Sequence, residues 1–168
     1  MKVLLSLFLF AITFFAQTQE MKTYTDNETG VSINYPSTWE YRENPRTVFI
    51  LICPLEKEGQ VFRENANLII NDNQDLTLQE YTGVAKMQRR KQLQGYKELS
   101  TETVELGGKQ YARIIYQHSI NNLSLQVAYY ILLQNGKAYN LTCSSTQIDF
   151  EKYLPVFEKM VSSLTVRG

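Results

Sequence analysis

Four segments in the second half of the chain have the length and apolar content of strands, and turn residues separate them. The turns are Gly107-Gly108, Asn121-Asn122 and Asn135-Gly136. Asn-Gly between two apolar runs favours a β-hairpin, because a type I′ turn needs positive φ at both central residues. The pattern therefore predicts an antiparallel meander with these strands: Glu98–Leu106, Gln110–His118, Leu123–Gln134 and Lys137–Ser145.

The first half of the chain predicts shorter strands. Thr23–Thr25 and Val31–Tyr35 flank a polar turn, and Pro36 ends the second strand because proline has no N–H for the sheet ladder. Thr47–Leu55 is a continuous apolar run, which is typical of a strand buried on both faces. Asn67–Asn71 is predicted as one more short strand.

Two segments have the spacing of amphipathic helices. Residues 78–93 follow Thr77, which together with Glu80 forms the pattern of a capping box. The second helix is predicted over Asp149–Ser162, where Pro155 either kinks the helix or marks its first turn. Strands in series with flanking helices predict an α+β fold with a mostly antiparallel sheet.

The N-terminal segment predicts a signal peptide over residues 1–16, with cleavage between positions 16 and 19. Lys2 precedes Val3–Ala16, a stretch of 14 residues without charge. A helix that spans a bilayer needs about 20 apolar residues, so this stretch has the length of a secretory signal. We therefore expect an exported bacterial protein, periplasmic or secreted, whose mature part is a single domain (20–168) without a membrane span.

Composition excludes several classes of function. The 168 residues contain 17 Lys and Arg against 17 Asp and Glu, so the chain lacks the basic field that drives most nucleic-acid binding. One histidine and two cysteines are too few for a two-imidazole site or a four-cysteine zinc site. The sequence has no nucleophile elbow, zinc-protease motif or phosphate-binding glycine loop. We expect no enzyme activity, no metal site and no cofactor.

Two polar features have structural explanations. His118 lies near a strand end before a turn and has no nucleophile or orienting carboxylate in a local motif, so it is predicted as an edge or turn residue. Asn71–Asp75 resembles the start of a calcium loop, but Leu76 replaces the required glycine and Thr82 replaces the bidentate glutamate. A polar strand-to-helix connection with Asx turns explains this segment.

Cys53 and Cys143 lie on two predicted strands, and export would place them where disulfides form. A bridge requires Cα atoms within about 7 Å of each other. Both cysteines have apolar neighbours, which suit two buried free thiols equally well. A disulfide and two free thiols are therefore both compatible with the sequence.

Two groups of residues are candidates for a partner surface. Arg89, Arg90 and Lys91 form a basic cluster near the end of the predicted helix, where cations also complement the helix dipole. Some tyrosines of the meander are expected to face outward, and Tyr129 and Tyr130 are the candidates for a recognition surface. The alternatives are a solvated helix face and cross-strand packing with hydroxyls at the solvent edge.

Three features together resemble the PsbP-like superfamily. The Tyr24–Trp39 segment (YTDNETGVSINYPSTW) contains a tyrosine, a polar turn, a glycine, an alternating strand, Tyr-Pro and a tryptophan. A mid-chain helix precedes the long meander, and the closing helix is Phe150–Leu164 (FEKYLPVFEKMVSSL). The resemblance implies a PsbP-like α+β fold and an activity based on binding rather than catalysis.

These observations predict an exported, non-enzymatic binding or accessory domain that contacts another envelope protein through its sheet. The alternative is a small-molecule or lipid carrier with a pocket between the sheet and the helix at 78–93. Neither hypothesis involves a cofactor or a nucleic acid.

Overall fold

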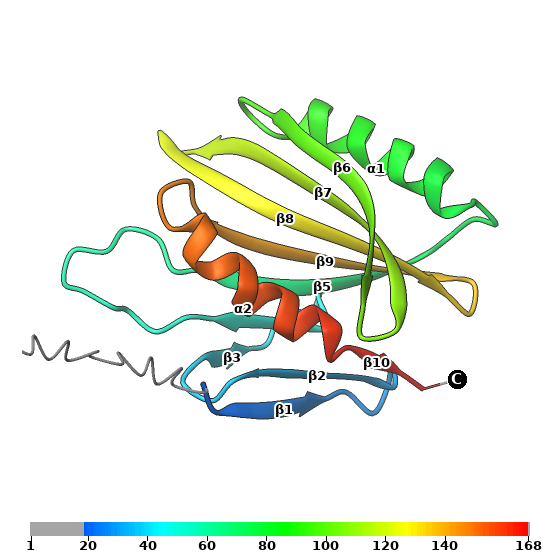
Figure 1. Cartoon of the computed structure of the whole chain (residues 1–168), viewed down its shortest axis with the longest axis horizontal. Coiled ribbons are helices and arrows are strands. Elements are labelled where there is room, and N and C mark those ends of the chain that lie inside the picture. The colour runs from blue at the N-terminus through cyan, green and yellow to red at the C-terminus, as the bar shows by residue number, and fades with distance from the viewer. Residues whose placement is uncertain (1–18, 168) are drawn as a thin grey trace, which may run out of the picture.

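A seven-stranded antiparallel sheet organises the molecule in the computed structural model, which describes residues 19–167 (Figure 1). From one edge to the other, its strand order is β3-β4-β5-β9-β8-β7-β6. The strands are β3 (Glu40–Arg42), β4 (Phe49–Ile52), β5 (Asn65–Asp72), β6 (Lys97–Leu106), β7 (Lys109–Ile120), β8 (Leu123–Gln134) and β9 (Lys137–Thr146).

A second, three-stranded sheet has the order β1-β2-β10 and packs with helix α2 on one face of the large sheet. Helix α1 lies on the opposite face (Figure 1). The remaining elements are β1 (Met21–Thr25), β2 (Val31–Pro36), β10 (Thr165–Val166), α1 (Leu78–Gln92) and α2 (Phe150–Ser162). The predicted α+β class, with a mostly antiparallel sheet between helices, is confirmed.

The predicted meander is confirmed, since β6, β7, β8 and β9 follow one another in the chain and pair in that order. The turn between β8 and β9 has positive φ at Asn135 (53°) and Gly136 (71°). Asn121-Asn122 and Gly107-Gly108 also have positive φ at both positions. Asparagine and glycine tolerate this conformation better than other residues, so the hairpins form at the predicted turns.

Residues alternate along β8 between two hydrophobic cores. Tyr130 and Leu132 belong to the larger core beside α2 and the small sheet, whereas Tyr129 and Ile131 belong to the core under α1. Tyr129 is 2% exposed and Tyr130 is 0% exposed. The expectation that Tyr129 or Tyr130 faces outward is therefore wrong, because other elements cover both faces of the sheet at β8.

Two strands near the edge of the sheet differ from the prediction. Thr47–Leu55 contributes only the four residues of β4, which alternate between buried and half-buried. β4 lies next to the edge strand β3. Its inward face packs on the core, whereas its other face is only half-buried. The prediction that this strand is buried on both faces is therefore wrong. β3 has no signal in the sequence, because its three residues are all exposed and it forms by pairing with β4.

Both predicted helices are present. At the start of α1 the Thr77 hydroxyl accepts a hydrogen bond from the Glu80 amide at 3.3 Å, and the Glu80 carboxylate accepts one from the Thr77 amide at 2.9 Å, so the capping box is confirmed. α2 begins at Phe150 and contains Pro155 in its interior, so the first-turn alternative for Pro155 is wrong. Pro155 is exposed, and its missing N–H therefore removes a hydrogen bond on the solvent side of the helix.

The described chain begins at Gln19, two residues before β1, and the predicted signal peptide lies outside the described residues. Among residues 19–167, no helix is both long enough and apolar enough to cross a membrane.

Candidate functional site

Helix α1 covers only part of the sheet face on which it lies. It contacts β7 and β8, and an ion pair between Lys86 Nζ and Glu98 Oε1 at 2.7 Å ties it to β6. In the sheet register Tyr129, Thr142 and Asn67 are neighbours on adjacent strands, so their side chains lie on this same face. In the described part of the chain, the backbone of no helix lies over β9, β5 and β4 on this face, and of α1 the Tyr81 side chain reaches β9 and β5 (Figure 1). We term this part of the face the open strip.

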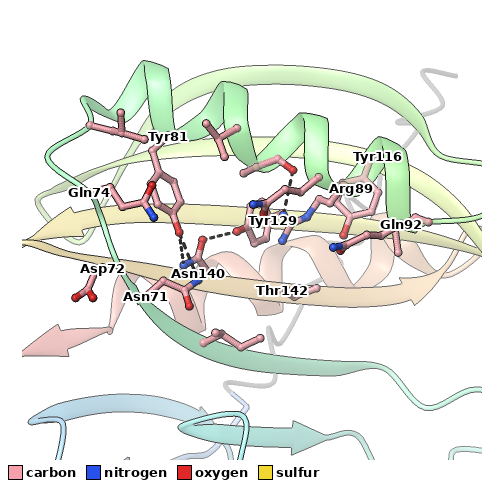
Figure 2. Close-up of a pocket in the computed structure, with 16 residues that line it drawn as sticks. Asn71, Asp72, Gln74, Tyr81, Arg89, Gln92, Tyr116, Tyr129, Asn140 and Thr142 are labelled. Carbon is pink, nitrogen blue, oxygen red and sulfur yellow. Dashed lines mark hydrogen bonds between the residues drawn. The ribbon is translucent and has the colours of Figure 1, made fainter.

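A cleft of about 650 Å³, termed the α1 cleft, lies between α1 and the open strip (Figure 2). Its helical wall consists of residues from one face of α1: Tyr81, Val84, Ala85, Gln88, Arg89 and Gln92. The sheet and the segments that flank α1 contribute Ile69, Asn71, Asp72, Gln74, Leu76, Leu93, Tyr116, Tyr129, Asn140 and Thr142. Amide, hydroxyl and guanidinium groups dominate this lining, so the α1 cleft suits a polar ligand.

Hydrogen bonds between side chains hold the floor of the α1 cleft in place (Figure 2). The Tyr129 hydroxyl donates to Asn140 Oδ1, and Asn140 Nδ2 donates to the Tyr81 hydroxyl at 3.2 Å. Asn140 Nδ2 also donates to the Ala138 carbonyl at 2.9 Å, and Asn71 Nδ2 lies 3.4 Å from the Tyr81 hydroxyl. Burial raises the pKa of Tyr129 to about 12, so its hydroxyl remains a neutral donor at physiological pH.

Arg89 crosses the cleft from α1 to the sheet. Its guanidinium carbon lies 3.3 Å from the centre of the Tyr129 ring and 6.0 Å from that of Tyr116. The structure thus brings together two of the residues predicted for a partner surface, although Tyr129 is buried under the arginine. Arg90 and Lys91 are exposed and do not line the cleft, because successive helix residues point in different directions.

Tyr130 lies on the opposite face of the sheet from the α1 cleft. Its ring packs edge-on against Tyr111 at 6.4 Å between ring centres, and burial raises its pKa. This packing assigns Tyr130 to the larger core and removes it from the candidate surface.

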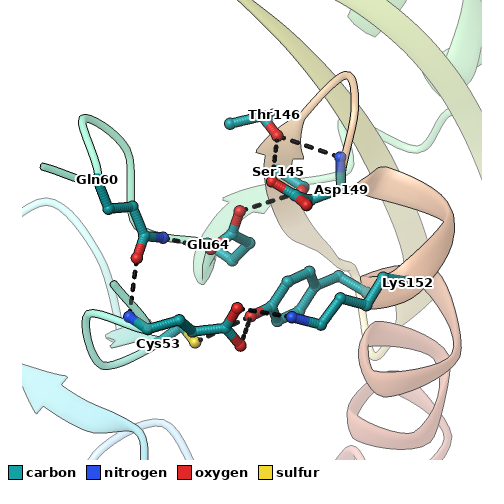
Figure 3. A network of polar contacts seen from close by, with 9 residues as sticks. Cys53, Gln60, Glu64, Ser145, Thr146, Asp149 and Lys152 are labelled. Carbon is teal, nitrogen blue, oxygen red and sulfur yellow. Dashed lines mark hydrogen bonds and ion pairs between the residues drawn. The ribbon is translucent and has the colours of Figure 1, made fainter. Parts of the chain in front are cut away.

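A second polar network lies around Glu64, which is 1% exposed (Figure 3). Gln60 Nε2 and Ser145 Oγ donate to the two oxygens of Glu64 at 3.3 Å each. Beside it, the Tyr153 hydroxyl donates to Glu56 at 2.5 Å and lies 3.4 Å from Cys53 Sγ. Sequence reasoning did not identify Glu64, because the polar run before β5 has the pattern of an exposed loop.

Both cysteines are free and buried. Ala66 of β5 pairs with Leu51 of β4 on one side and with Cys143 of β9 on the other. Cys53 follows β4, and its amide donates a hydrogen bond to the Glu64 carbonyl just before β5. The segment that contains β5 therefore lies between the two cysteines. Two strand spacings are about 9–10 Å, which exceeds the Cα separation that a disulfide allows. The sequence was compatible with a disulfide and with two free thiols, and the structure has two free thiols.

His118 and the polar segment before α1 do not form a reactive site in the structure. His118 lies near the end of β7, as predicted, but it is 8% exposed on an interior strand, so the description as an edge or turn residue is wrong. Burial lowers its pKa. The Asp75 amide donates to Asn73 Oδ1 at 3.1 Å, which confirms the predicted Asx turn in Asn71–Asp75. Among residues 19–167, no three metal-ligating side chains lie close enough together to hold an ion.

Exposed apolar side chains gather at one end of the molecule. Val61 is 83% exposed and Ile148 is 93% exposed. Together with Phe62 and Leu123 they line a second hollow of about 590 Å³. This apolar end is separate from the α1 cleft, because the two hollows share no lining residue.

The PsbP family model matches residues 19–166 of this chain. The solution structure of cyanobacterial PsbP (CyanoP) from Synechocystis sp. PCC 6803 is similar, with a TM-score of 0.66 and 17% identity over 91% of this chain and 96% of that one. LpqN of Mycobacterium tuberculosis, described as involved in cell envelope biogenesis, has a TM-score of 0.66 and 13% identity over 89% of this chain and 91% of its own.

The Ran-binding protein Mog1p of Saccharomyces cerevisiae has a TM-score of 0.62 and 11% identity over 89% of this chain and 96% of its own. No match was found among curated protein sequences. At these identities the similarity to the solved structures concerns the fold.

Proposed function

Because this chain belongs to the PsbP family, as its sequence motifs predict, we propose that it is an exported, non-enzymatic binding protein of the cell envelope. Its partner is another envelope protein, and an extended segment of that partner lies in the α1 cleft. In this proposal the partner contacts the sheet at the open strip, and not through outward-facing Tyr129 and Tyr130 side chains.

The observation that carries the proposal is the incomplete cover of the sheet by α1. The α1 cleft continues onto the open strip, where Asn67 and Thr142 are half-buried, so a ligand has access along the strands. Side-chain amides both donate and accept hydrogen bonds, as peptide groups do. Asn71, Gln88 and Gln92 line the cleft with such amides, which matches the polar backbone of an extended polypeptide.

Two further observations support a binding role in the envelope. His118, Cys53 and Cys143 do not line the α1 cleft, so the side chains that most often act as bases or nucleophiles lie elsewhere. The similar LpqN is described as involved in cell envelope biogenesis, and the N-terminal segment of this chain predicts export.

The carrier alternative places its pocket between the sheet and the helix at 78–93, where the α1 cleft lies. An acyl chain in this cleft would cover Asn140, Thr142 and Arg89 without offering them hydrogen bonds. Such unpaired polar groups are unfavourable, so the lining favours a polypeptide over a lipid.

Site-directed photo-crosslinking in the producing cell tests the proposal. A photoreactive p-benzoylphenylalanine replaces Gln88 in the helical wall or Ile69 on β5 in the open strip, and Glu151, exposed on α2, is the control position. We expect both cleft positions to crosslink to the same envelope protein, and the control position to give no such product. A partner captured only from position 148, at the apolar end, would overturn the assignment to the α1 cleft.

A pair of substitutions on α1 provides a second test. Val84 and Met87 are both exposed apolar residues, at 36% and 52%, but only Val84 lines the α1 cleft. Val84→Arg places a long charged side chain in the cleft, so we expect it to weaken the partner's affinity by about tenfold or more, measured by biolayer interferometry. Met87→Arg should leave the affinity within about twofold of the unmodified protein. Equal effects of the two substitutions would contradict the proposed site.

A further inference from the structure

Arg89 is a cation without a carboxylate partner. Within residues 19–167 Arg89 forms no ion pair, as is also true of exposed cations such as Arg90 and Lys91, but Arg89 alone among these three lines the α1 cleft. Its hydrogen bond to the Ala85 carbonyl is long, at 3.4 Å. A guanidinium has five N–H donors, and the Ala85 carbonyl accepts from only one of its two terminal nitrogens, so Arg89 retains donors for a ligand in the α1 cleft.

Two tyrosine rings hold this guanidinium in position. The 3.3 Å distance to the Tyr129 ring centre places the two groups in contact, and Tyr116 flanks them at 6.0 Å. A guanidinium in contact with an aromatic ring is attracted by the negative face of the ring, and Arg89 also lines the α1 cleft, so its side chain is reached from the cleft. The arginine is therefore preorganised, and a ligand need not order a freely rotating side chain.

We propose that Arg89 binds a carboxylate of the polypeptide in the α1 cleft, an inference that rests on the proposed function. The planar fork of arginine N–H groups matches the two oxygens of a carboxylate. Asp72, the acidic residue that lines the cleft, is paired with Lys137 at 2.5 Å and does not neutralise Arg89. One cation in the lining matches the single charge of a carboxylate better than the nearly double charge of a phosphate group.

The distance between Tyr81 and Arg89 along α1 indicates how many residues of the partner lie in the cleft. Tyr81 and Arg89 are eight residues apart on the helix, which corresponds to about 12 Å along its axis. An extended polypeptide covers this distance with about three to four residues. The carboxylate belongs either to the C-terminus of the partner or to an aspartate or glutamate side chain, and both supply the same chemistry to Arg89.

Three short peptides serve as probes in an NMR titration of the ¹⁵N-labelled protein. The first peptide, acetyl-Ala-Ala-Ala, has a free α-carboxylate. The second, acetyl-Ala-Ala-Ala-amide, has the same side chains and no charge. The third, acetyl-Ala-Ala-Asp-amide, carries its carboxylate on a side chain. The side-chain amide signals of Gln88 and Gln92 report on the cleft. We expect at least one acidic peptide to bind about tenfold more tightly than the neutral one. The tighter of the two acidic peptides identifies the source of the carboxylate.

Arg89→Gln should abolish the preference for the acidic peptides, because it keeps a polar side chain and removes the charge. Arg90→Gln is the matched control, since Arg90 is exposed and does not line the cleft, and it should retain the preference. Arg89→Lys retains the charge without the planar fork and should retain part of the preference, which provides a second variant if Arg89→Gln does not fold.

The outcomes separate this inference from the proposed function. Equal binding of all three peptides in the cleft, or an acidic preference that persists in Arg89→Gln, would overturn the role of Arg89 and leave polypeptide binding in place. If none of the peptides shifts the cleft signals at millimolar concentration, both the inference and the binding of polypeptides in the α1 cleft are wrong.

Discussion

Glu64 illustrates how a single buried carboxyl group responds to its surroundings. Burial raises its pKa, and the nearby charges of Asp149 and Glu56 raise it further. The groups that contact it, Gln60 and Ser145, are neutral, and Glu64 forms no ion pair within residues 19–167. Neutral donors compensate only part of the desolvation of an ionised carboxylate, so ionised Glu64 destabilises the fold.

Glu64→Gln is therefore expected to stabilise the protein at neutral and alkaline pH. The stability that protonated Glu64 contributes is present below the unfolded-state pKa of about 4.3 and is lost as pH rises through the raised folded-state pKa. We expect the free energy of unfolding at about pH 8 to rise by about 1 kcal/mol, and the difference to disappear near about pH 4. Urea denaturation at both pH values measures this.

The exposed Glu105 on β6 provides the control for that measurement, since Glu105→Gln should change the free energy of unfolding little at either pH. A Glu64→Gln variant that is less stable than the unmodified protein at about pH 8 would show that the carboxylate is compensated.

The β6–β7 hairpin and the end of α2 meet at a glycine. Gly107 has a φ of +58°, and a Cβ at this position would overlap the carbonyl oxygen of Ser162. Gly108 has a φ of +71°, but no atom lies within 4 Å of the position that its Cβ would occupy. Both glycines supply the positive φ of the turn, and Gly107 in addition allows the hairpin to approach the helix closely.

Alanine substitutions separate these two requirements. Gly108→Ala carries only the conformational penalty and should lower the free energy of unfolding by about 1 kcal/mol. Gly107→Ala adds a backbone overlap, so we expect a loss of about 3 kcal/mol, measured by thermal or chemical denaturation. Losses of equal size in the two variants would contradict the close approach of the hairpin to α2.

Across the complete fold, the large sheet separates two cores and distributes polar and apolar groups between its faces. The core beside α2 contains Trp39, which packs edge-on against Phe157 at 6.2 Å, as well as both cysteines. The opposite face has the smaller core under α1 and the open strip. The proposed binding site therefore lies on the face where cover is incomplete, and the thiols are shielded on the other face.

This arrangement predicts unreactive thiols in the folded protein. Cys143 is 0% exposed and Cys53 is 3% exposed, and burial raises the pKa of both thiols, so little thiolate is present. A thiol-specific chromogenic reagent should react with neither cysteine until the protein unfolds, and then with both. The midpoint of thermal unfolding should be the same with and without a reductant. A reductant-dependent midpoint would indicate an intramolecular disulfide and contradict the sheet register.

Local sequence signals predicted the parts of the fold that depend on neighbouring residues. The hairpin at Asn135-Gly136 and the capping box at Thr77 need only a few adjacent residues, and both are confirmed. The short β4 and the unpredicted β3 depend on pairing with a strand elsewhere in the chain, and the apolar run Thr47–Leu55 cannot show how much of it is paired.

For the candidate site, the sequence identified Arg89 and Tyr129 as residues of interest, but for a reason that the structure corrects. Tyr129 is a buried support for the arginine and not an outward-facing contact. Glu64 and Asn140 had no distinguishing pattern, because their importance arises from burial and from partners that are distant in the chain.

By itself, the amino-acid sequence determined the α+β class, the meander, the two helices and the membership in the PsbP family, because turn chemistry, hydrophobic periodicity and helix caps act over short distances. Only the tertiary structure decided which sheet face remains open, that β5 separates the two cysteines, and that Arg89 lies against Tyr129. These features depend on strand order and on where α1 crosses the sheet. Both are set by packing between segments far apart in the chain, on which local sequence patterns carry little information.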